Sequence, residues 1–249
     1  MCSQKIDQLN ILNLRINKIL YSDLLNLIAE AIDNRIHLTI TGANASTVNL
    51  SLNNSEFKNA LDNIDYIHPD GIGVYLSSKF LYGANGFQSK ITGSDFYYEL
   101  INTAIKKQWS FFFFGDEDKT LNKIFSVYPE LNIAGLHNGF EYENDKLLDM
   151  INKSGPDILI VGMGSPKQEE WIIKSKQKLD VKIIIAVGDG IKIFSGSKRR
   201  GPKILRKFGL EWLVRLFFDP KRLWKRYLIG NPLFIIRLLK YKFFIINNN

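Results

Sequence analysis

Short and almost fully apolar runs recur along the first three quarters of the chain, separated by stretches with a polar face. Such runs are typical of strands in a parallel sheet, because both faces of that sheet are covered. The runs that predict strands are residues 36–41, 64–68, 110–114, 132–136, 158–161 and 182–187.

Between these runs, apolar residues recur at helical spacing. In residues 21–34, for example, Leu24, Ile28 and Ile32 fall on one helical face. Other helices are expected at residues 72–81, 94–107 and 168–178, and from about residues 46 and 119 onward. Strands that alternate with helices predict an α/β fold, in which a parallel sheet carries helices on both faces.

After Gly196 the pattern changes to helical segments alone. Helices are expected at residues 208–218, 221–229 and 233–246, with breaks at Pro220 and at the Gly230-Asn231-Pro232 segment. The sequence therefore predicts a core at residues 1–195 and a small helical appendage at residues 196–249.

The positive charge of the chain lies in this appendage. From Lys198 onward there are fourteen Lys or Arg residues and two acids, whereas the net charge of the whole chain is +8. Basic residues interleaved with bulky aromatic ones suit the headgroup zone of an anionic membrane. The alternative is a packed helical subdomain with a solvated basic side.

Composition excludes several classes of protein. A single cysteine, Cys2, leaves no internal disulfide or cysteine-based metal site, and three scattered histidines form no metal pattern. The first residues do not resemble a signal peptide, and no apolar run is long enough to span a membrane. We therefore expect a cytoplasmic protein without a resident metal.

The segment from Gly162 to Trp171 carries the clearest candidate chemistry. Gly162 and Gly164 allow a sharp turn after a strand, Ser165 can cap a helix, and Gln168 stands three residues later, as in a capping box. Free N–H groups at such a helix start favour an anion such as a diphosphate. The alternative is a capped helix without a ligand; the segment matches neither a dinucleotide fingerprint nor a P-loop.

Polar residues follow several of the predicted strands. Asn44, Asp70, the Gly162 loop and the Gly188-Asp189-Gly190 turn each come directly after a strand. Because ligands of parallel sheets bind at the carboxyl ends of the strands, we expect these residues to line one cleft.

Four ordered blocks of the sequence resemble the WecG/TagA/CpsF glycosyltransferases, glycosyltransferase family 26. They are Asp-Gly-Ile-Gly-Val at residues 70–74, Thr-Gly-Ser-Asp at residues 92–95, the loop at residues 162–169 and a signature between Gly209 and Pro232. The resemblance covers most of the chain and implies a Rossmann-like core with an appendage that reaches the membrane.

This resemblance implies an inverting hexosyltransferase. Members take N-acetylmannosamine or a related sugar from a UDP donor and attach it to N-acetylglucosamine on a diphosphate polyprenol, for a surface polysaccharide or teichoic acid. No metal cofactor is expected, and the protein would lie on the inner face of the cytoplasmic membrane.

The resemblance also assigns roles to residues. Asp70 matches the proposed base, although an aspartate at that place could simply cap the next helix. Arg215, Arg222 and Arg226 match arginines thought to contact the lipid diphosphate, with general headgroup attraction as the alternative. The residues expected to bind the donor are Thr41, Asn44, Lys90, Gly162, Gly164, Gln168, Asp189 and Lys192.

Some positions depart from the family pattern. Gly42 stands where the family often has threonine, and Lys90 replaces an arginine. Residues 188–192 read Gly-Asp-Gly-Ile-Lys where many members have Gly-Ala-x-Phe-Asp, so that Lys192 replaces an acid and Asp189 adds one nearby. The donor sugar need not be the same.

Two other functions remain open at this point. The basic appendage could bind nucleic acid, although its bulky apolar content and the lack of a base-reading motif argue against it. A nucleotide-sugar epimerase or dehydrogenase is disfavoured by the missing dinucleotide fingerprint. The appendage helices could also pack between subunits of a homo-oligomer.

Overall fold

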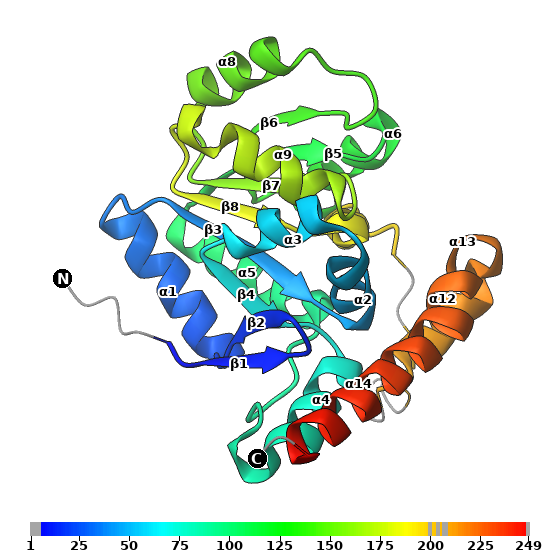
Figure 1. Cartoon of the computed structure of the whole chain (residues 1–249). Helices are drawn as coiled ribbons and strands as arrows, with labels where there is room; N and C mark the ends of the chain where they lie inside the picture. The colour runs from blue at the N-terminus through cyan, green and yellow to red at the C-terminus, as the bar shows by residue number, and fades with distance from the viewer. Residues whose placement is uncertain (1–5, 199–200, 203–204, 206–208, 248–249) are drawn as a thin grey trace.

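The computed structural model describes residues 6–198, 201–202, 205 and 209–247. Its centre is a six-stranded parallel sheet with the strand order β4-β3-β8-β7-β5-β6 (Figure 1). The strands are β3 (Leu38–Ala43), β4 (Tyr66–Pro69), β5 (Ser110–Gly115), β6 (Asn132–His137), β7 (Ile158–Gly162) and β8 (Ile183–Ala186). The predicted α/β fold with a parallel sheet is confirmed, with strand ends shifted by up to two residues.

Side chains of the sheet alternate between two hydrophobic cores, because successive residues of a strand point to opposite faces. In β5, Phe111 and Phe113 lie in one core, and Phe112 and Phe114 lie in the other. The first core is covered by α1 (Tyr21–Asp33), α5 (Gly93–Lys107), α6 (Asp118–Leu121), α7 (Lys123–Val127) and α10 (Ile191–Phe194). The second is covered by α2 (Ala45–Asn53), α3 (Ser55–Asp62), α8 (Asn144–Ser154) and α9 (Lys167–Ser175).

A hairpin of β1 (Gln8–Ile11) and β2 (Leu14–Asn17) lies beside the edge strand β4. Sequence analysis predicted neither strand of this hairpin. The Asn17 side chain accepts a hydrogen bond from the backbone N–H of Ile67 at 2.8 Å. The hairpin therefore covers an edge whose unpaired backbone groups would otherwise need water or another chain.

The C-terminal segment contains α12 (Glu211–Phe218), α13 (Pro220–Trp224), a π-helical turn (Lys225–Ile229) and α14 (Gly230–Asn247). The predicted break at Pro220 is confirmed, since this proline starts α13. Phe208, the predicted start of the first helix, lies outside the described residues.

The predicted break at Gly230-Asn231-Pro232 is wrong, because α14 runs through it. The N–H of Gly230 bonds to the carbonyl of Lys225, five residues earlier. The wider π turn makes room for the Pro232 ring and tolerates its missing N–H, which an ordinary helical turn would not.

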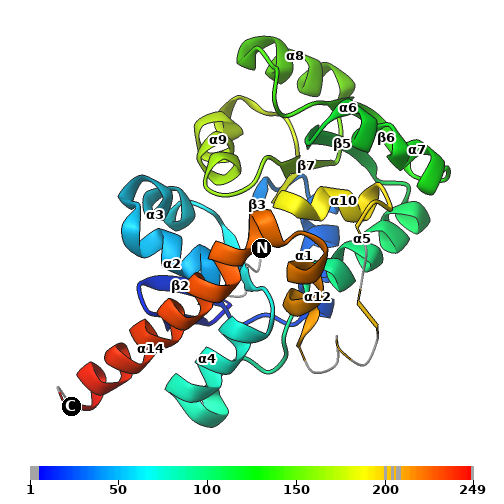
Figure 2. The same ribbon diagram turned by 90° about the vertical axis from the view of Figure 1, so that its right-hand side faces the viewer.

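Helix α14 docks on the core through α2. Phe234 and Leu238 are buried in the second core, and Arg237 donates to the backbone O and side-chain Oδ1 of Asn49, at 3.2 and 2.9 Å. In Figures 1 and 2, α14 lies beside α4 (Ile72–Tyr82), and the two helices extend together from the sheet. Among the described helices, none has the length and apolar character needed to cross a membrane.

Replacing Arg237 with alanine is expected to loosen α14. The Arg237 guanidinium also donates to Asn53 Oδ1 at 2.9 Å, and hydrogen bonds from a charged group of this kind contribute about 1.5–3 kcal/mol when shielded. Since Arg237 is only half-buried, we expect a loss of about 1–2 kcal/mol. Hydrogen exchange of the α14 amides would measure it; Lys240→Ala, at an exposed position of the same helix, should leave exchange unchanged.

Candidate active site

Asp70 follows β4 directly and faces a cavity of about 650 Å³. Its backbone N–H donates to the carbonyl of Ala43 at 2.8 Å, and the chain then turns at Gly71, whose φ is +83°. A positive φ favours glycine, so this residue type suits the turn that leads from the strand into α4. The turn thus leaves Asp70 at the carboxyl end of the sheet, as predicted.

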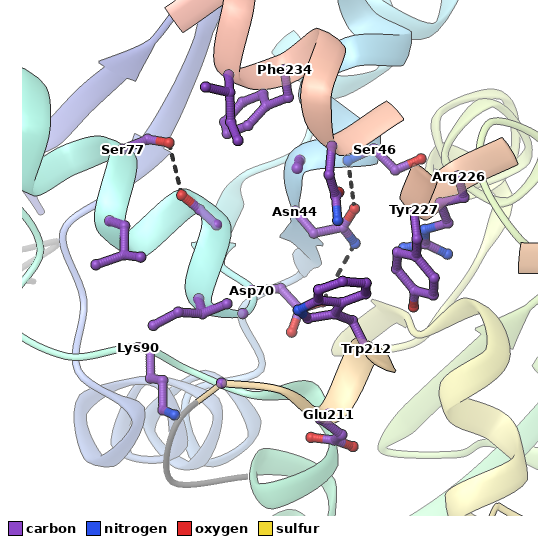
Figure 3. A pocket seen from close by; sticks show the side chains of 18 of the residues that line it. Asn44, Ser46, Asp70, Ser77, Lys90, Glu211, Trp212, Arg226, Tyr227 and Phe234 are labelled. Carbon is purple, nitrogen blue, oxygen red and sulfur yellow. Dashed lines mark hydrogen bonds between the residues drawn. The ribbon is translucent and has the colours of Figure 1, made fainter. Parts of the chain in front are cut away.

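Two donors from different elements hold the Asp70 carboxylate. The N–H of Gly93, the first residue of α5, donates to Oδ1 at 3.0 Å, and Nδ2 of Asn44 approaches Oδ2 at 3.5 Å (Figure 3). Helix α4 has Gly71 as its N-cap, with no side-chain bond. The alternative that Asp70 caps the helix directly after it is therefore wrong; its carboxylate is oriented by the starts of α2 and α5.

Asn44 serves both the fold and the site. As N-cap of α2, its Oδ1 accepts from the N–H groups of Ser46 and Thr47, and the Thr47 hydroxyl accepts from the Asn44 N–H in return. With Oδ1 occupied by the helix, the amide group is fixed so that Nδ2 faces Asp70.

Charged side chains from distant segments line the same cavity. Lys90 comes from the segment before α5, Arg215 from α12 and Arg226 from the π-helical turn. Arg215 Nη2 donates to Glu211 Oε1 at 2.8 Å, while its buried Nε has no partner among the described residues. Of the predicted site residues, the cavity brings together Asn44, Asp70, Lys90, Arg215 and Arg226.

Sequence analysis did not assign several lining residues to the site. Trp212 and Tyr227 lie on the appendage side with their ring centroids 5.6 Å apart, and Glu211 holds Arg215. The i,i+4 spacing of Glu211 and Arg215 could have indicated the pair. For Trp212 and Tyr227, the sequence pattern does not distinguish residues that line a cavity from residues that face a membrane.

Asp189 and Lys192 lie in a second, charged cluster outside this cavity. Oxygen atoms of the Asp189 carboxylate lie 3.6 Å from Lys192 Nζ, 3.3 Å from Lys198 Nζ and 3.4 Å from Arg222 Nη1. Lys192 Nζ is also 3.7 Å from Asp116 Oδ2. Arg222 therefore pairs with Asp189 of the core. It does not line the cavity that holds Arg215 and Arg226.

The protonation of this cluster follows from burial and charge. Burial raises the pKa of the Asp189 carboxyl, but the positive charges of Lys198, Arg222 and Lys192 lower this pKa by a larger amount. The net shift is therefore downward. Burial and the charge of Arg215 lower the pKa of Lys198 to about 8. Sequence analysis missed Lys198 and Asp116, although Asp116 follows β5 as Asp70 follows β4.

The Gly162 loop is built differently from the predicted capping box. The peptide before Pro166 is cis, Pro166 is the N-cap of α9 and Ser165 makes no cap. Gln168 Oε1 instead accepts from the N–H groups of Gly164 and Gly188, at 3.2 and 2.8 Å. The Ser165 capping prediction is therefore wrong: Gln168 ties the Gly162 loop to the turn after β8.

A buried carboxyl group fixes this arrangement. Glu169 Oε1 accepts from Thr41 Oγ1 at 3.1 Å, Ser165 Oγ at 2.9 Å and Gln168 Nε2 at 2.8 Å. Burial raises the pKa of Glu169 above its ordinary value despite these bonds. Thr41 therefore points to Glu169 inside the core and does not line the Asp70 cavity.

Gly42 is the neighbour of Thr41 that faces the site. A Cβ atom at Gly42 would lie 2.8 Å from Cε1 of His68 and 3.2 Å from Cβ of Asp70. His68 is buried, and burial lowers its pKa despite the charge of Asp70. The neutral imidazole thus occupies the space that a side chain at Gly42 would need.

No group of three or more His, Cys, Asp or Glu residues could hold a metal ion in the part of the chain that the structure describes. The polar groups at the carboxyl end of the sheet include the oriented carboxylate of Asp70, several cations and a glycine loop. Such a set can accept a proton at Asp70 and stabilise negative charge nearby.

Comparison with known proteins identifies related chains of similar length. The protein is 30% identical to the "N-acetylglucosaminyldiphosphoundecaprenol N-acetyl-beta-D-mannosaminyltransferase" of Bacillus subtilis (strain 168), over 84% of this chain and 82% of that one. Identity to the same-named protein of Staphylococcus aureus (strain MRSA252) is 29%, over 83% and 81%. Residues 9–248 match the model of the "Glycosyl transferase WecG/TagA/CpsF family". The chain therefore belongs to the WecG/TagA/CpsF family of glycosyl transferases.

Proposed function

We propose that this chain transfers N-acetylmannosamine, or a related sugar, from a UDP donor to N-acetylglucosamine carried on a diphosphate polyprenol. One observation carries the proposal: an oriented carboxylate, Asp70, lies in a cavity with cations at one end and apolar walls at the other. The names of the relatives, which specify a diphosphoundecaprenol acceptor and an N-acetylmannosaminyl group, agree with it.

Asp70 would act as the general base. It takes the proton of the acceptor hydroxyl as that oxygen bonds to the anomeric carbon, and the bond from this carbon to UDP breaks, with the electron pair leaving on the diphosphate. Attack from the side opposite UDP inverts the anomeric configuration. The Asn44 amide and the Gly93 N–H hold the carboxylate in place for this transfer.

Two groups of cations would serve the two diphosphates. Lys192, Lys198 and Arg222 gather at the ends of β5 and β8, beside the Gly162 loop, and suit the UDP diphosphate. Arg215 and Arg226 line the Asp70 cavity and suit the lipid diphosphate. Positive charge at these places stabilises the leaving group and anchors the acceptor.

The appendage would hold the enzyme on the inner face of the cytoplasmic membrane. Phe217, Phe243 and Phe244 are strongly exposed, which is unusual for large apolar side chains. The basic residue Lys240 lies on the helix of Phe243 and Phe244, and Lys221 lies on α13, which follows the helix of Phe217. Residues 1–195 would then carry the base, and residues 196–249 the lipid contacts together with Lys198 and Arg222 of the proposed donor site. Nothing in the structure or the relatives favours nucleic acid as the partner.

The direct test is UDP release with a panel of UDP-sugars and a water-soluble acceptor, N-acetylglucosamine on a diphosphate with a short alkyl group. We expect release that depends on the acceptor, fastest with UDP-N-acetylmannosamine. Acceptor-dependent release with another sugar would keep the reaction and correct the donor. No acceptor-dependent release with any donor, from protein that still binds UDP, would contradict the proposal.

UDP binding is expected to weaken as the pH rises through about 8, the pKa of Lys198. Above that pH the ammonium group loses its proton, and with it one positive charge of the proposed diphosphate site. We expect Kd for UDP, measured by calorimetry, to rise about tenfold between pH 7 and 9, since a charge-assisted contact contributes on this scale.

Lys198→Arg should flatten this profile, because a guanidinium remains charged throughout. Lys182→Arg is the matched control, because Lys182 pairs with Asp157 at the other end of β8 and should keep the wild-type profile. An unchanged pH profile in Lys198→Arg would mean that Lys198 does not contact the donor.

A further inference from the structure

The walls of the Asp70 cavity change character along its length. Next to Asp70 they carry Lys90 and Arg215, whereas farther along α4 and α14 they are apolar. On α4 the large apolar lining residues recur every four positions, at Ile72, Leu76 and Phe80, and so form one stripe that leads away from Asp70. From Ile72 to Phe80 this stripe is about 12 Å long, at 1.5 Å per residue.

Helix α14 supplies the opposite wall. Phe234, Ile235 and Leu238 line the cavity from this helix, which lies beside α4 in both views (Figures 1 and 2). Figure 3 shows Phe234 and Lys90 on opposite sides of the Asp70–Asn44 pair. The far ends of the two helices are tied together, because Lys242 donates to the carbonyl of Leu81 at 3.1 Å.

The apolar walls are exposed where a folded protein would normally bury such residues. Leu76 is 55% exposed, Phe80 is 44% exposed and Ile235 is 54% exposed, although all three line a concave surface. Contiguous exposed apolar surface of this kind marks a place where an apolar ligand binds. The Ser77 hydroxyl in the same wall is bonded to the carbonyl of Gly73 within its own helix, at 2.7 Å.

We propose that the groove between α4 and α14 binds the first isoprene units of the acceptor's polyprenyl chain. The chain enters from the far ends of the two helices, and its diphosphate lies beside Arg215 and Arg226, near Asp70. This inference rests on the proposed function and adds to it the site of the tail, so that the acceptor is held at both its diphosphate and its lipid.

The order of groups along the cavity favours this ligand over others. A lipid diphosphate presents a sugar, two phosphates and a branched apolar chain in that sequence; the cavity presents Asp70, cations and apolar walls in the same sequence. A peptide would need partners for its backbone N–H and C=O groups, which Leu76, Phe80 and Ile235 do not offer. The groove thus fits an amphiphile whose charged end is directed inward.

A pair of variants on α14 tests the groove. Ile235 and Ile236 are adjacent isoleucines of similar exposure, 54% and 50%, but only Ile235 lines the cavity. Calorimetry would compare farnesyl diphosphate with inorganic diphosphate as probes. We expect wild-type protein to bind farnesyl diphosphate about 100-fold more tightly than inorganic diphosphate. In Ile235→Asn this preference should fall to about tenfold, and in Ile236→Asn it should stay within about twofold of the wild-type value.

Two results would overturn the proposal. If wild-type protein binds both probes equally, the groove does not recognise an isoprenoid. If both variants weaken farnesyl diphosphate binding alike, the exposed face of α14 contacts lipid without a defined groove. These binding measurements require no sugar transfer. They can therefore contradict the isoprenoid groove while the UDP-sugar panel supports sugar transfer, or support the groove while the panel contradicts sugar transfer.

The same pair separates the tail from the chemistry. With the short-alkyl acceptor, which has no isoprenoid, Ile235→Asn should keep the wild-type kcat and KM. With an acceptor that carries a farnesyl group, its KM should rise about tenfold and its kcat should stay unchanged. A rise in KM with both acceptors would show that the substitution disturbs the diphosphate region, and would contradict a role confined to the tail.

Discussion

Replacing Asp70 with asparagine is expected to reduce kcat by about 10²–10⁴-fold, the contribution typical of a general base. The asparagine carbonyl can still accept from the Gly93 N–H, so the local fold is retained. Only the ability to take the acceptor proton is lost. Kd for UDP, measured by calorimetry, should stay within about twofold of wild type, because binding precedes proton transfer.

Asp65 offers the matched control for this experiment. It stands at the other end of β4, where its Oδ2 accepts from the N–H and the hydroxyl of Thr39, at 2.8 and 2.6 Å. Asp65→Asn should lower the stability and leave kcat of the folded enzyme near wild type. If Asp70→Asn retained more than about a tenth of the wild-type kcat, Asp70 would not be the base.

Replacing Glu169 with alanine is expected to destabilise the protein by about 3–5 kcal/mol, since three donors, two of them buried, would lose their acceptor. These donors are Thr41, Ser165 and Gln168, and Gln168 also holds the Gly162 loop to Gly188. The donor site should therefore loosen as well. Urea unfolding would measure the stability, and calorimetry would show a higher Kd for UDP.

Glu169→Gln is the control, because its amide oxygen can accept the same three bonds. The folded-state pKa of Glu169 lies above its unfolded value, so the folded state binds more protons between the two pKa values. Wild-type stability therefore falls as the pH rises from about 4.5 through the folded-state pKa, and Glu169→Gln should lack this decrease. If the stability of wild type and that of Glu169→Gln changed equally with pH, the pKa of Glu169 would not be raised in the folded state.

The strands and the place of Asp70 could be predicted from local sequence, because buried parallel strands are apolar runs and ligands meet their carboxyl ends. Helix α8 was missed, although Leu147, Leu148 and Ile151 have helical spacing and are buried. Sequence analysis gave it no helix because the apolar positions are few among polar neighbours.

Where the prediction was wrong, distant partners decided the structure. Ser165 has the chemistry of a cap, but its hydroxyl binds Glu169, which Thr41 also approaches from 128 residues away in the sequence. Asp189 and the appendage residue Arg222 form an ion pair although they lie 33 residues apart in the sequence, too far for a local pattern to connect them. Local rules contain no information on which of several possible partners folding brings near.

The π-helical turn at Lys225–Ile229 has a consequence for how this protein tolerates change. Each residue advances a helix by about 100°, so deletion of one residue from the turn would rotate all of α14 by that angle. Ile235 would leave the groove, and Arg237 would leave Asn49, in a single step. The length of this segment keeps the acceptor groove and the docking face in phase. Outside the residues that line the cavity, such as Arg226 and Tyr227, substitutions there can accumulate, whereas insertions and deletions cannot.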